Sequence, residues 1–255
     1  MKLSSLRRSI ALLAAVVRTV SASPTIPQII NADTVTLAFN GSIDFNITVC
    51  PEIHIFGARE TTTPQGFGSS ITLIDLLNNT FPGRVTAEQI FYPAAGGSNA
   101  EYSASVTAGV QAVVQQTAAF TAMCPQSIVI MHGYSQGAQI MDDAFCGGPD
   151  GVSLNSSGVS LVSRQTASNV AAIILMGDPR HVDGFPPNVG NATGFGFAAR
   201  PKGFRCPAFE NRMQSYCDSP DPFCSNGTSI ATHQGYGQEY GKQALAFILG
   251  KLLIS

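Results

Sequence analysis

The sequence predicts an α/β fold in three layers, in which helices cover both faces of a central, mostly parallel sheet of about five strands. From Cys50 onward, short apolar runs alternate with segments of helix length, which is typical of strands joined by crossover helices. The runs are rich in Ile and Val, as strands buried on both faces are. A chain of 255 residues, 44% of them hydrophobic, can bury one sizeable core, so we expect a single domain.

The spacing of apolar residues predicts four strands and three helices. The predicted strands are residues 52–58, 86–94, 127–133 and 170–177. The predicted helices are residues 69–81, 101–124 and 238–253. One stripe of the first helix is apolar, namely Ile71, Ile74, Leu77 and Phe81. Ser69 or Ser70 is its expected N-cap, and the Gly-rich segments 147–165 and 184–204 are expected to be irregular.

The first residues have the features of a secretory signal peptide, which we place at residues 1–22. Basic residues precede an apolar stretch at 10–17, and Val20-Ser21-Ala22 offers a cleavage site. Arg18 departs from the usual pattern, so a short amphipathic helix is the alternative. We expect residues 23–49 to be an N-terminal extension or pro-segment with strand-like composition, and residues 50–254 to be the functional domain.

The composition excludes several classes of partner. Only 12% of the residues are charged and the net charge is -2, so we expect no binding of nucleic acid or of an anionic membrane. The apolar N-terminal stretch is too short to span a bilayer. The sequence contains no histidine cluster, paired carboxylate motif or phosphate-binding loop, so neither a metal nor another cofactor is expected.

Cysteine number and spacing also indicate export. The six cysteines include no Cys-x-x-Cys motif, so an exported chain is expected to oxidise them to three disulfides. Of the fifteen formal pairings, the residues alone favour only Cys217 with Cys224, which closes a short loop. Asn-x-Ser/Thr sites for glycans occur at Asn40, Asn46, Asn78, Asn155, Asn191 and Asn226.

The chemistry centres on Gly133-x-Ser135-x-Gly137, which lies between a predicted strand and a helix-like segment. This is the sequence context of a nucleophile elbow in α/β-hydrolases, where flanking glycines allow a sharp turn and the serine hydroxyl projects above the sheet. The alternative is a structural Gly-Ser turn. A serine alone is a poor nucleophile, so the elbow interpretation requires a base and an acid farther along the chain.

Two histidines and three aspartates compete for these roles. His181 follows a strand, and His233 is expected in a loop just before the C-terminal helix. Asp221 lies inside the small ring that the favoured disulfide would close, and a stiff ring suits a carboxylate that must orient an imidazole. Asp218 in the same ring and Asp178 elsewhere are the alternatives.

Several ordered motifs resemble one family across roughly residues 50–253. They read "CPEIHIFGARET", "GYSQGAQI", "MGDPR", "YCDSPDPFC" and "HQGYGQEYGKQALAF". Together they are similar to the cutinase-like carbohydrate esterases, most closely to the fungal acetylxylan esterases. The resemblance implies a catalytic triad of Ser135, Asp221 and His233. It also implies an oxyanion hole formed by Thr61 and Gln136.

The resemblance extends to the disulfides. It implies the pairs Cys50–Cys124, Cys146–Cys206 and Cys217–Cys224. Two further cysteine pairs common in close relatives have both partners missing here, so no unpaired thiol results. His132 stands where relatives usually have an apolar residue, and the sequence suggests no role for it.

The resemblance implies a secreted serine esterase that removes acetyl groups from plant cell-wall polysaccharide, with acetylxylan as the expected substrate. Residues 222–232, between acid and base, are mostly small and polar, with Phe223 and Ile230 as exceptions, which favours a short acyl group. Tyr134 and Tyr236 are expected to contact the substrate. The alternatives are a cutinase acting on longer acyl chains and, from another class, a secreted wall-binding protein without activity. We expect a monomer.

Overall fold

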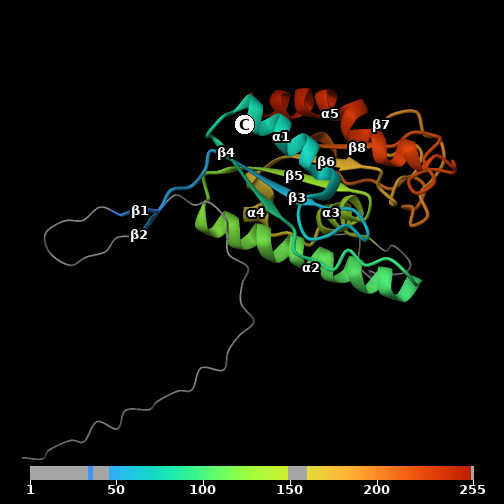
Figure 1. Cartoon of the computed structure of the whole chain (residues 1–255), viewed down its shortest axis with the longest axis horizontal. Coiled ribbons are helices and arrows are strands. Elements are labelled where there is room, and N and C mark those ends of the chain that lie inside the picture. The colour runs from blue at the N-terminus through green and yellow to red at the C-terminus, as the bar shows by residue number, and fades with distance from the viewer. Residues whose placement is uncertain (1–33, 37–45, 149–159, 254–255) are drawn as a thin grey trace, which may run out of the picture.

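The computed structural model describes residues 34–36, 46–148 and 160–253 (Figure 1). The expected signal peptide and most of the expected extension at 23–49 lie outside the described residues. Two short strands, β1 (Thr34–Thr36) and β2 (Asn46–Thr48), pair antiparallel and belong to no other sheet. Within the described part of the chain, no helix has the length and apolar character that crossing a membrane requires.

Six parallel strands form the central sheet, in the order β4-β3-β5-β6-β8-β7 (Figure 1). They are β3 (Ile53–Ala58), β4 (Val85–Gln89), β5 (Ile128–Tyr134), β6 (Val170–Met176), β7 (Asn188–Val189) and β8 (Met213–Tyr216). The four predicted strands are confirmed as β3 to β6, although β4 ends five residues early. The sequence pattern missed β7 and β8 because both are short and neither contains an apolar run.

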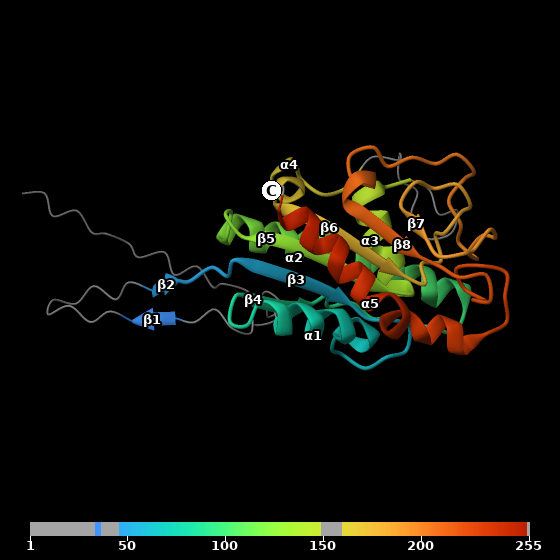
Figure 2. The same ribbon diagram turned by 90° about the horizontal axis from the view of Figure 1, so that it is seen from above.

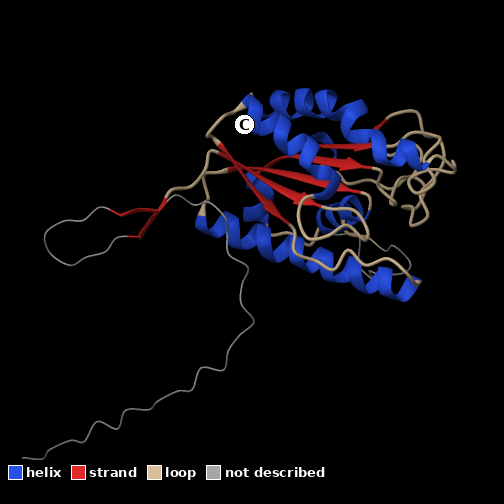
Figure 3. Ribbon diagram, viewed as in Figure 1, coloured by secondary structure: helices blue, strands red, loops and turns tan. Residues whose placement is uncertain are grey.

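Helices cover both faces of this sheet, so the predicted three-layer α/β fold is confirmed (Figures 2 and 3). One face carries α1 (Ile71–Thr80) and α5 (Ile230–Leu252), and the other carries α2 (Asn99–Met123), α3 (Gln136–Cys146) and α4 (Arg164–Asn169). Short 3-10 helices occur at Gly68–Ser70 and Glu210–Arg212. Each face has its own hydrophobic cluster, one under α2 and α3 and one under α1 and α5.

Helix starts differ from the sequence prediction for identifiable reasons. Helix α2 begins two residues early because Ser98 and Glu101 form a reciprocal capping box. Ser70 is the N-cap of α1, but its hydroxyl donates to the carbonyl of Ala58 instead of accepting from the helix. Ile71, predicted to be buried, is 41% exposed, because the buried stripe of α1 runs through Leu73, Ile74 and Leu77.

Helix α5 begins at Ile230, eight residues before the predicted start, so the expectation that His233 lies in a loop is wrong. Its N-cap Ser229 accepts a hydrogen bond from the N–H of Thr232 at 3.1 Å. Gly237 of this helix lies where an added Cβ would be 3.0 Å from the Thr72 hydroxyl of α1. The glycine therefore serves the close packing of two helices, and His233 belongs to the first turn of α5.

Three disulfides fasten the ends of these elements. Cys50–Cys124 joins the start of β3 to the end of α2, Cys146–Cys206 joins the end of α3 to the loop before β8, and Cys217–Cys224 closes a ring after β8. These are the pairs that the family resemblance implied. No described cysteine is free.

Candidate active site

Ser135 lies at a sharp turn between β5 and α3. Its φ of 54° and ψ of -119° are unusual for a residue with a side chain and store backbone strain. A Cβ at Gly133 would collide with the carbonyl of Gly137, and a Cβ at Gly137 would collide with that of Ala58. Only glycine fits on either side, so the motif has the local geometry of a nucleophile elbow.

His233 and Asp221 are in direct contact. The Nδ1 atom of His233 lies 2.7 Å from Oδ2 of Asp221. The other oxygen, Oδ1, accepts hydrogen bonds from the N–H groups of Phe223 at 2.6 Å and Cys224 at 3.0 Å. Burial by itself would raise the pKa of Asp221, but the His233 contact and the two backbone donors outweigh it and hold that pKa below its usual value. Asp221 is therefore an ionised, fixed carboxylate.

The two alternative acids have other partners, and the imidazole of the alternative base makes no hydrogen bond to either of them or to Asp221 among the described residues. Asp218 accepts hydrogen bonds from the Tyr240 hydroxyl at 2.9 and 3.0 Å and contacts no histidine. Asp178 is buried among the acids of α3, where burial raises its pKa well above the usual value, and it caps the N–H of Arg180. His181 is buried, and burial lowers its pKa. None of the three contacts His233 or Ser135 through a hydrogen bond among the described residues.

Ser135 and His233 both line a cavity of about 680 Å³ at the carboxyl ends of the parallel strands. This edge of the sheet is where ligands bind in open α/β folds. Among the described residues, the Ser135 hydroxyl makes no hydrogen bond to His233. Such bonds are often long in an enzyme without substrate and tighten when substrate binds.

Thr61 follows β3, and Gln136 directly follows Ser135 in the chain. Thr61 lines the same cavity, and no hydrogen bond within the described residues uses its N–H or hydroxyl. Its neighbour Thr62 donates its N–H to Ala94 and its hydroxyl to the Thr61 carbonyl. The N–H of Gln136 is the first of α3 and has no partner inside the helix. The N–H groups of Thr61 and Gln136 therefore have no acceptor among the described residues, which a donor to an oxyanion requires.

The Gln136 side chain has a separate task. It accepts a hydrogen bond from the Ser105 hydroxyl at 2.9 Å and donates one to the Ala95 carbonyl at 2.9 Å. These contacts tie the first residue of α3 to helix α2 and to the loop after β4. They hold the residue that follows Ser135 in a fixed orientation.

The expectation that Tyr236 contacts substrate is wrong. Tyr236 is 1% exposed and does not line the cavity; its hydroxyl donates to Oδ2 of Asp221 at 2.9 Å and accepts from the Asp218 N–H at 2.9 Å. Tyr134 does line the cavity, but its hydroxyl donates to the His233 carbonyl at 2.6 Å. The two tyrosine hydroxyls therefore bond to His233 and to Asp221.

The cavity also contains aromatic residues that sequence reasoning did not select. Tyr102 comes from α2, and Phe197 comes from the segment predicted to be an irregular loop. Their rings meet edge to face with centroids 5.4 Å apart. Phe223, noted as an exception in a polar interval, packs 4.5 Å from the His233 ring. No spacing along the chain relates Phe197 to Ser135, so only the folded structure brings them together.

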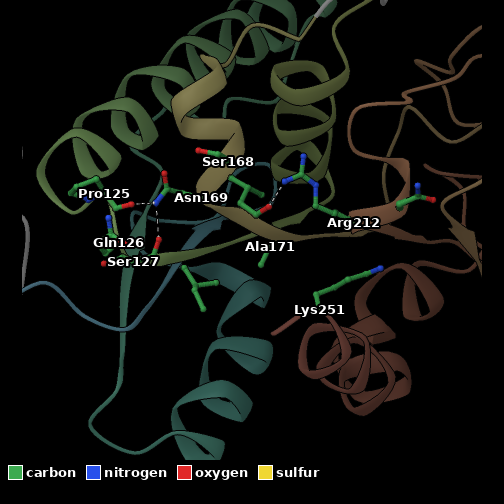
Figure 4. A pocket seen from close by; sticks show the side chains of 11 residues that line it. Pro125, Gln126, Ser127, Ser168, Asn169, Ala171, Arg212 and Lys251 are labelled. Carbon is green, nitrogen blue, oxygen red and sulfur yellow. Dashed lines mark hydrogen bonds between the residues drawn. The ribbon is translucent and has the colours of Figure 1, made fainter. Parts of the chain in front are cut away.

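A second cavity of about 420 Å³ lies at the opposite edge of the sheet, where β5 and β6 begin (Figure 4). Two of its polar side chains are already used by the fold. Asn169 donates to the carbonyls of Pro125 and Ser127, both at 2.9 Å, and Arg212 donates to those of Ala167 and Val170. No described histidine or carboxylate lines this cavity, so it lacks the combination of serine and histidine that the first cavity contains.

The remaining histidines belong to the core. His132 of β5 is fully buried and places Nδ1 3.0 Å from the carbonyl oxygen of Ile174, and burial lowers its pKa to about 4. His54 of β3 stacks on Phe120 with ring centroids 3.9 Å apart, and burial lowers its pKa to about 3. Among the described residues, no group of three or more His, Cys, Asp or Glu side chains could hold a metal ion.

Comparison with known proteins identifies the family. The family model described as Cutinase matches residues 49–252. The chain belongs to the cutinase family. Two relatives are 49% identical over 208 residues, covering 80% of this chain: Cutinase 11 of Verticillium dahliae, of which 70% is covered, and Acetylxylan esterase of Hypocrea jecorina, of which 68% is covered.

Solved structures of the cutinase family have the same fold. The catalytic core domain of acetyl xylan esterase from Trichoderma reesei is 46% identical, and it superimposes with a TM-score of 0.76. The match covers 80% of this chain and all of that one. The single parallel sheet with helices on both faces is thus the cutinase-family form of the α/β-hydrolase fold.

Proposed function

We propose that this protein is a secreted serine esterase that removes acetyl groups from acetylated xylan or a similar cell-wall polysaccharide. That it is a carboxylic ester hydrolase follows from its family and its relatives. The observation that supports the mechanism best is the 2.7 Å contact of His233 with Asp221, in a cavity that His233 shares with the strained Ser135.

In the proposed reaction the Ser135 hydroxyl attacks the carbonyl carbon of the acetyl ester, and His233 accepts its proton. Asp221 orients the imidazole and stabilises the imidazolium. The N–H groups of Thr61 and Gln136 bind the oxyanion, each aligned donor contributing roughly 3 kcal/mol. The tetrahedral intermediate expels the sugar alkoxide, which takes the proton from His233. Water then attacks the acetyl-serine while His233 takes one of its protons, and His233 returns that proton to the Ser135 oxygen as acetate is released.

Two considerations favour an acetyl ester of a sugar. The relatives from Hypocrea jecorina and Talaromyces purpureogenus are named acetylxylan esterases. Thr61, Thr62, Thr63, Ser69 and Asn99 contribute polar side chains to the cavity lining, which suits a hydroxyl-rich alcohol. A cutinase acting on longer acyl chains is the second candidate, because Cutinase 11 is equally similar in sequence and Phe197, Phe223 and Ile230 add apolar surface.

Acetate release from acetylated xylan, measured beside hydrolysis of 4-nitrophenyl acetate and octanoate, separates these candidates. We expect acetate from xylan and faster turnover of the acetyl than of the octanoyl ester. Faster turnover of octanoate, without release from xylan, would favour the cutinase. No turnover of any of the three esters would leave only the inactive wall-binding alternative.

Two variants test the assigned roles. Ser135→Ala should abolish turnover, and Asp221→Asn should lower kcat by about 10⁴-fold. Asp218→Asn is the matched control, because it changes the other carboxylate of the same ring, which contacts Tyr240 and not His233. Equal losses in the two aspartate variants would contradict the assignment of Asp221.

The same proposal covers processing and assembly. Residues 1–22 would act as the signal peptide, residues 23–49 as an extension or pro-segment, and residues 50–254 as a monomeric esterase domain. N-terminal sequencing of the secreted protein tests the boundaries, and light scattering tests the oligomeric state.

A further inference from the structure

The segment that carries Phe197 is fixed to the core on both sides of this residue. Gly196 donates its N–H to the His181 carbonyl at 2.9 Å, Phe197 to that of Phe223 at 3.2 Å, and Ala198 to that of Pro179 at 3.2 Å. An added Cβ at Gly196 would collide with the Pro179 carbonyl, so the backbone passes very close to its neighbour. The position of Phe197 is therefore set by the backbone, although no regular helix or strand contains it.

A buried ionic cluster anchors the end of this segment beneath the site. Arg200 places Nε 2.9 Å from Asp142 and Nη2 3.3 Å from Asp143, both on the helix that follows Ser135. Its guanidinium also lies over the Phe204 ring, 4.2 Å from the centroid. A buried charge pair is costly to break, so the cluster fixes the segment against α3.

Despite this fixed backbone, the Phe197 ring is 58% exposed. A single exposed apolar side chain is common on protein surfaces and needs no explanation. Phe197, however, lines the cavity of Ser135 and His233, and its ring is supported edge to face by Tyr102. The Tyr102 hydroxyl donates to Gln139 at 2.7 Å, which holds the Tyr102 ring in place beside Phe197.

The cavity is large for an acetyl group, since about 680 Å³ is the size of a pocket for a drug-sized ligand. Most of that space must therefore receive the rest of the ester. Its lining combines aromatic side chains, including Phe197 and Tyr102, with hydroxyl side chains, namely Thr61 to Thr63 and Ser69. A sugar ring has the matching surfaces, an apolar C–H face and a rim of hydroxyl groups, whereas a long acyl chain has only apolar ones.

We propose that the exposed ring of Phe197 is a stacking surface for a sugar unit of the polysaccharide, next to the unit that carries the reacting acetyl group. This inference rests on the proposed function and adds the residue that recognises the alcohol side of the ester. Phe197 acts on binding of the polymer, and it makes no contribution to the acetyl transfer itself.

The test compares Phe197→Ala with Phe195→Ala. Phe195 is two residues away on the same segment and is 60% exposed, but it does not line the cavity. For each variant, kcat/KM is measured on acetylated xylan and on 4-nitrophenyl acetate, which has no sugar. We expect the ratio of kcat/KM on acetylated xylan to kcat/KM on 4-nitrophenyl acetate to fall about fivefold to tenfold in Phe197→Ala. It should keep its wild-type value in Phe195→Ala and recover in Phe197→Trp.

The outcomes separate this inference from the proposed function. If the wild type releases acetate from xylan and both alanine variants keep the wild-type ratio, the stacking surface is refuted and the proposed function stands. If Phe197→Ala lowers kcat/KM on 4-nitrophenyl octanoate instead, the ring contacts the acyl chain and the inference is refuted. If the wild type deacetylates no xylan, both fail. Thermal unfolding of each variant shows whether the fold is intact.

Discussion

Replacing Tyr236 by Phe removes one hydroxyl group and leaves the ring that packs in the core. In the structure this hydroxyl donates to Oδ2 of Asp221 at 2.9 Å, the same oxygen that contacts His233. We expect kcat to fall while KM stays nearly constant, because Tyr236 is 1% exposed and cannot touch substrate. Tyr236 is thus a positioning residue that acts through Asp221.

The magnitude follows from the number of donors that remain. A hydrogen bond to a charged group contributes about 1.5 to 3 kcal/mol. Asp221 keeps three donors after the substitution, from His233, Phe223 and Cys224, so the lower end of that range applies. A loss of about 1.4 kcal/mol in transition-state stabilisation corresponds to a kcat about tenfold lower.

Tyr240→Phe is the matched control for this experiment. Tyr240 lies one turn farther along α5, stacks on Tyr236 with ring centroids 6.1 Å apart, and donates its hydroxyl to Asp218. This variant also loses a hydrogen bond to a carboxylate of the disulfide ring, but that carboxylate, Asp218, does not contact His233. The measurement is steady-state kinetics on 4-nitrophenyl acetate. The role of the Tyr236 hydroxyl is refuted if kcat of Tyr236→Phe stays within twofold of the wild type, or if kcat of Tyr240→Phe falls equally.

Three further predictions concern stability. The pKa of His132 is about 4 in the folded protein and 6.5 without burial, so the unfolded chain binds a proton at His132 more readily. The free energy of unfolding is therefore expected to decrease by about 3 kcal/mol as the pH falls from 7 to 4. Urea unfolding at both pH values should show a smaller decrease in the free energy of unfolding for His132→Leu than for the wild type. An equal decrease in the two proteins would contradict the role of His132. The double variant Cys217→Ser, Cys224→Ser should lose roughly 2 to 3 kcal/mol and also activity, because the ring positions the acid; unchanged kinetics would refute that link. Gly137→Ala should lose roughly 3 kcal/mol, since its Cβ collides with the Ala58 carbonyl, and a wild-type melting temperature would contradict this.

Sequence patterns were most informative where local chemistry determines structure. The runs of Ile and Val identified β3 to β6, since strands buried on both faces are apolar along their whole length. The glycines around Ser135 identified the turn, since no other residue fits beside the Gly137 and Ala58 carbonyls.

Patterns failed where a residue's role depends on a partner distant in sequence. Gly237 breaks helices in general, yet here it permits α5 to pack against Thr72 of α1. Tyr236 suggested a sugar-binding surface, but burial directs its hydroxyl to Asp221, 15 residues earlier. Phe197 lies in a segment without periodicity, and hydrogen bonds to Pro179 and Phe223 bring that segment to the cavity.

Two tyrosine hydroxyls connect the segments that hold the three candidate catalytic residues. Tyr134, the residue before Ser135, donates to the His233 carbonyl at 2.6 Å and accepts from the Tyr236 N–H at 3.3 Å. The Tyr236 hydroxyl then reaches Asp221. The candidate nucleophile directly follows β5, the candidate base lies in α5 and the candidate acid lies in the disulfide ring, and these buried hydrogen bonds join the three segments. Each of these bonds joins two of the segments, so a segment cannot move without breaking a buried hydrogen bond. The tyrosine hydroxyls thereby preserve the relative positions of the three side chains.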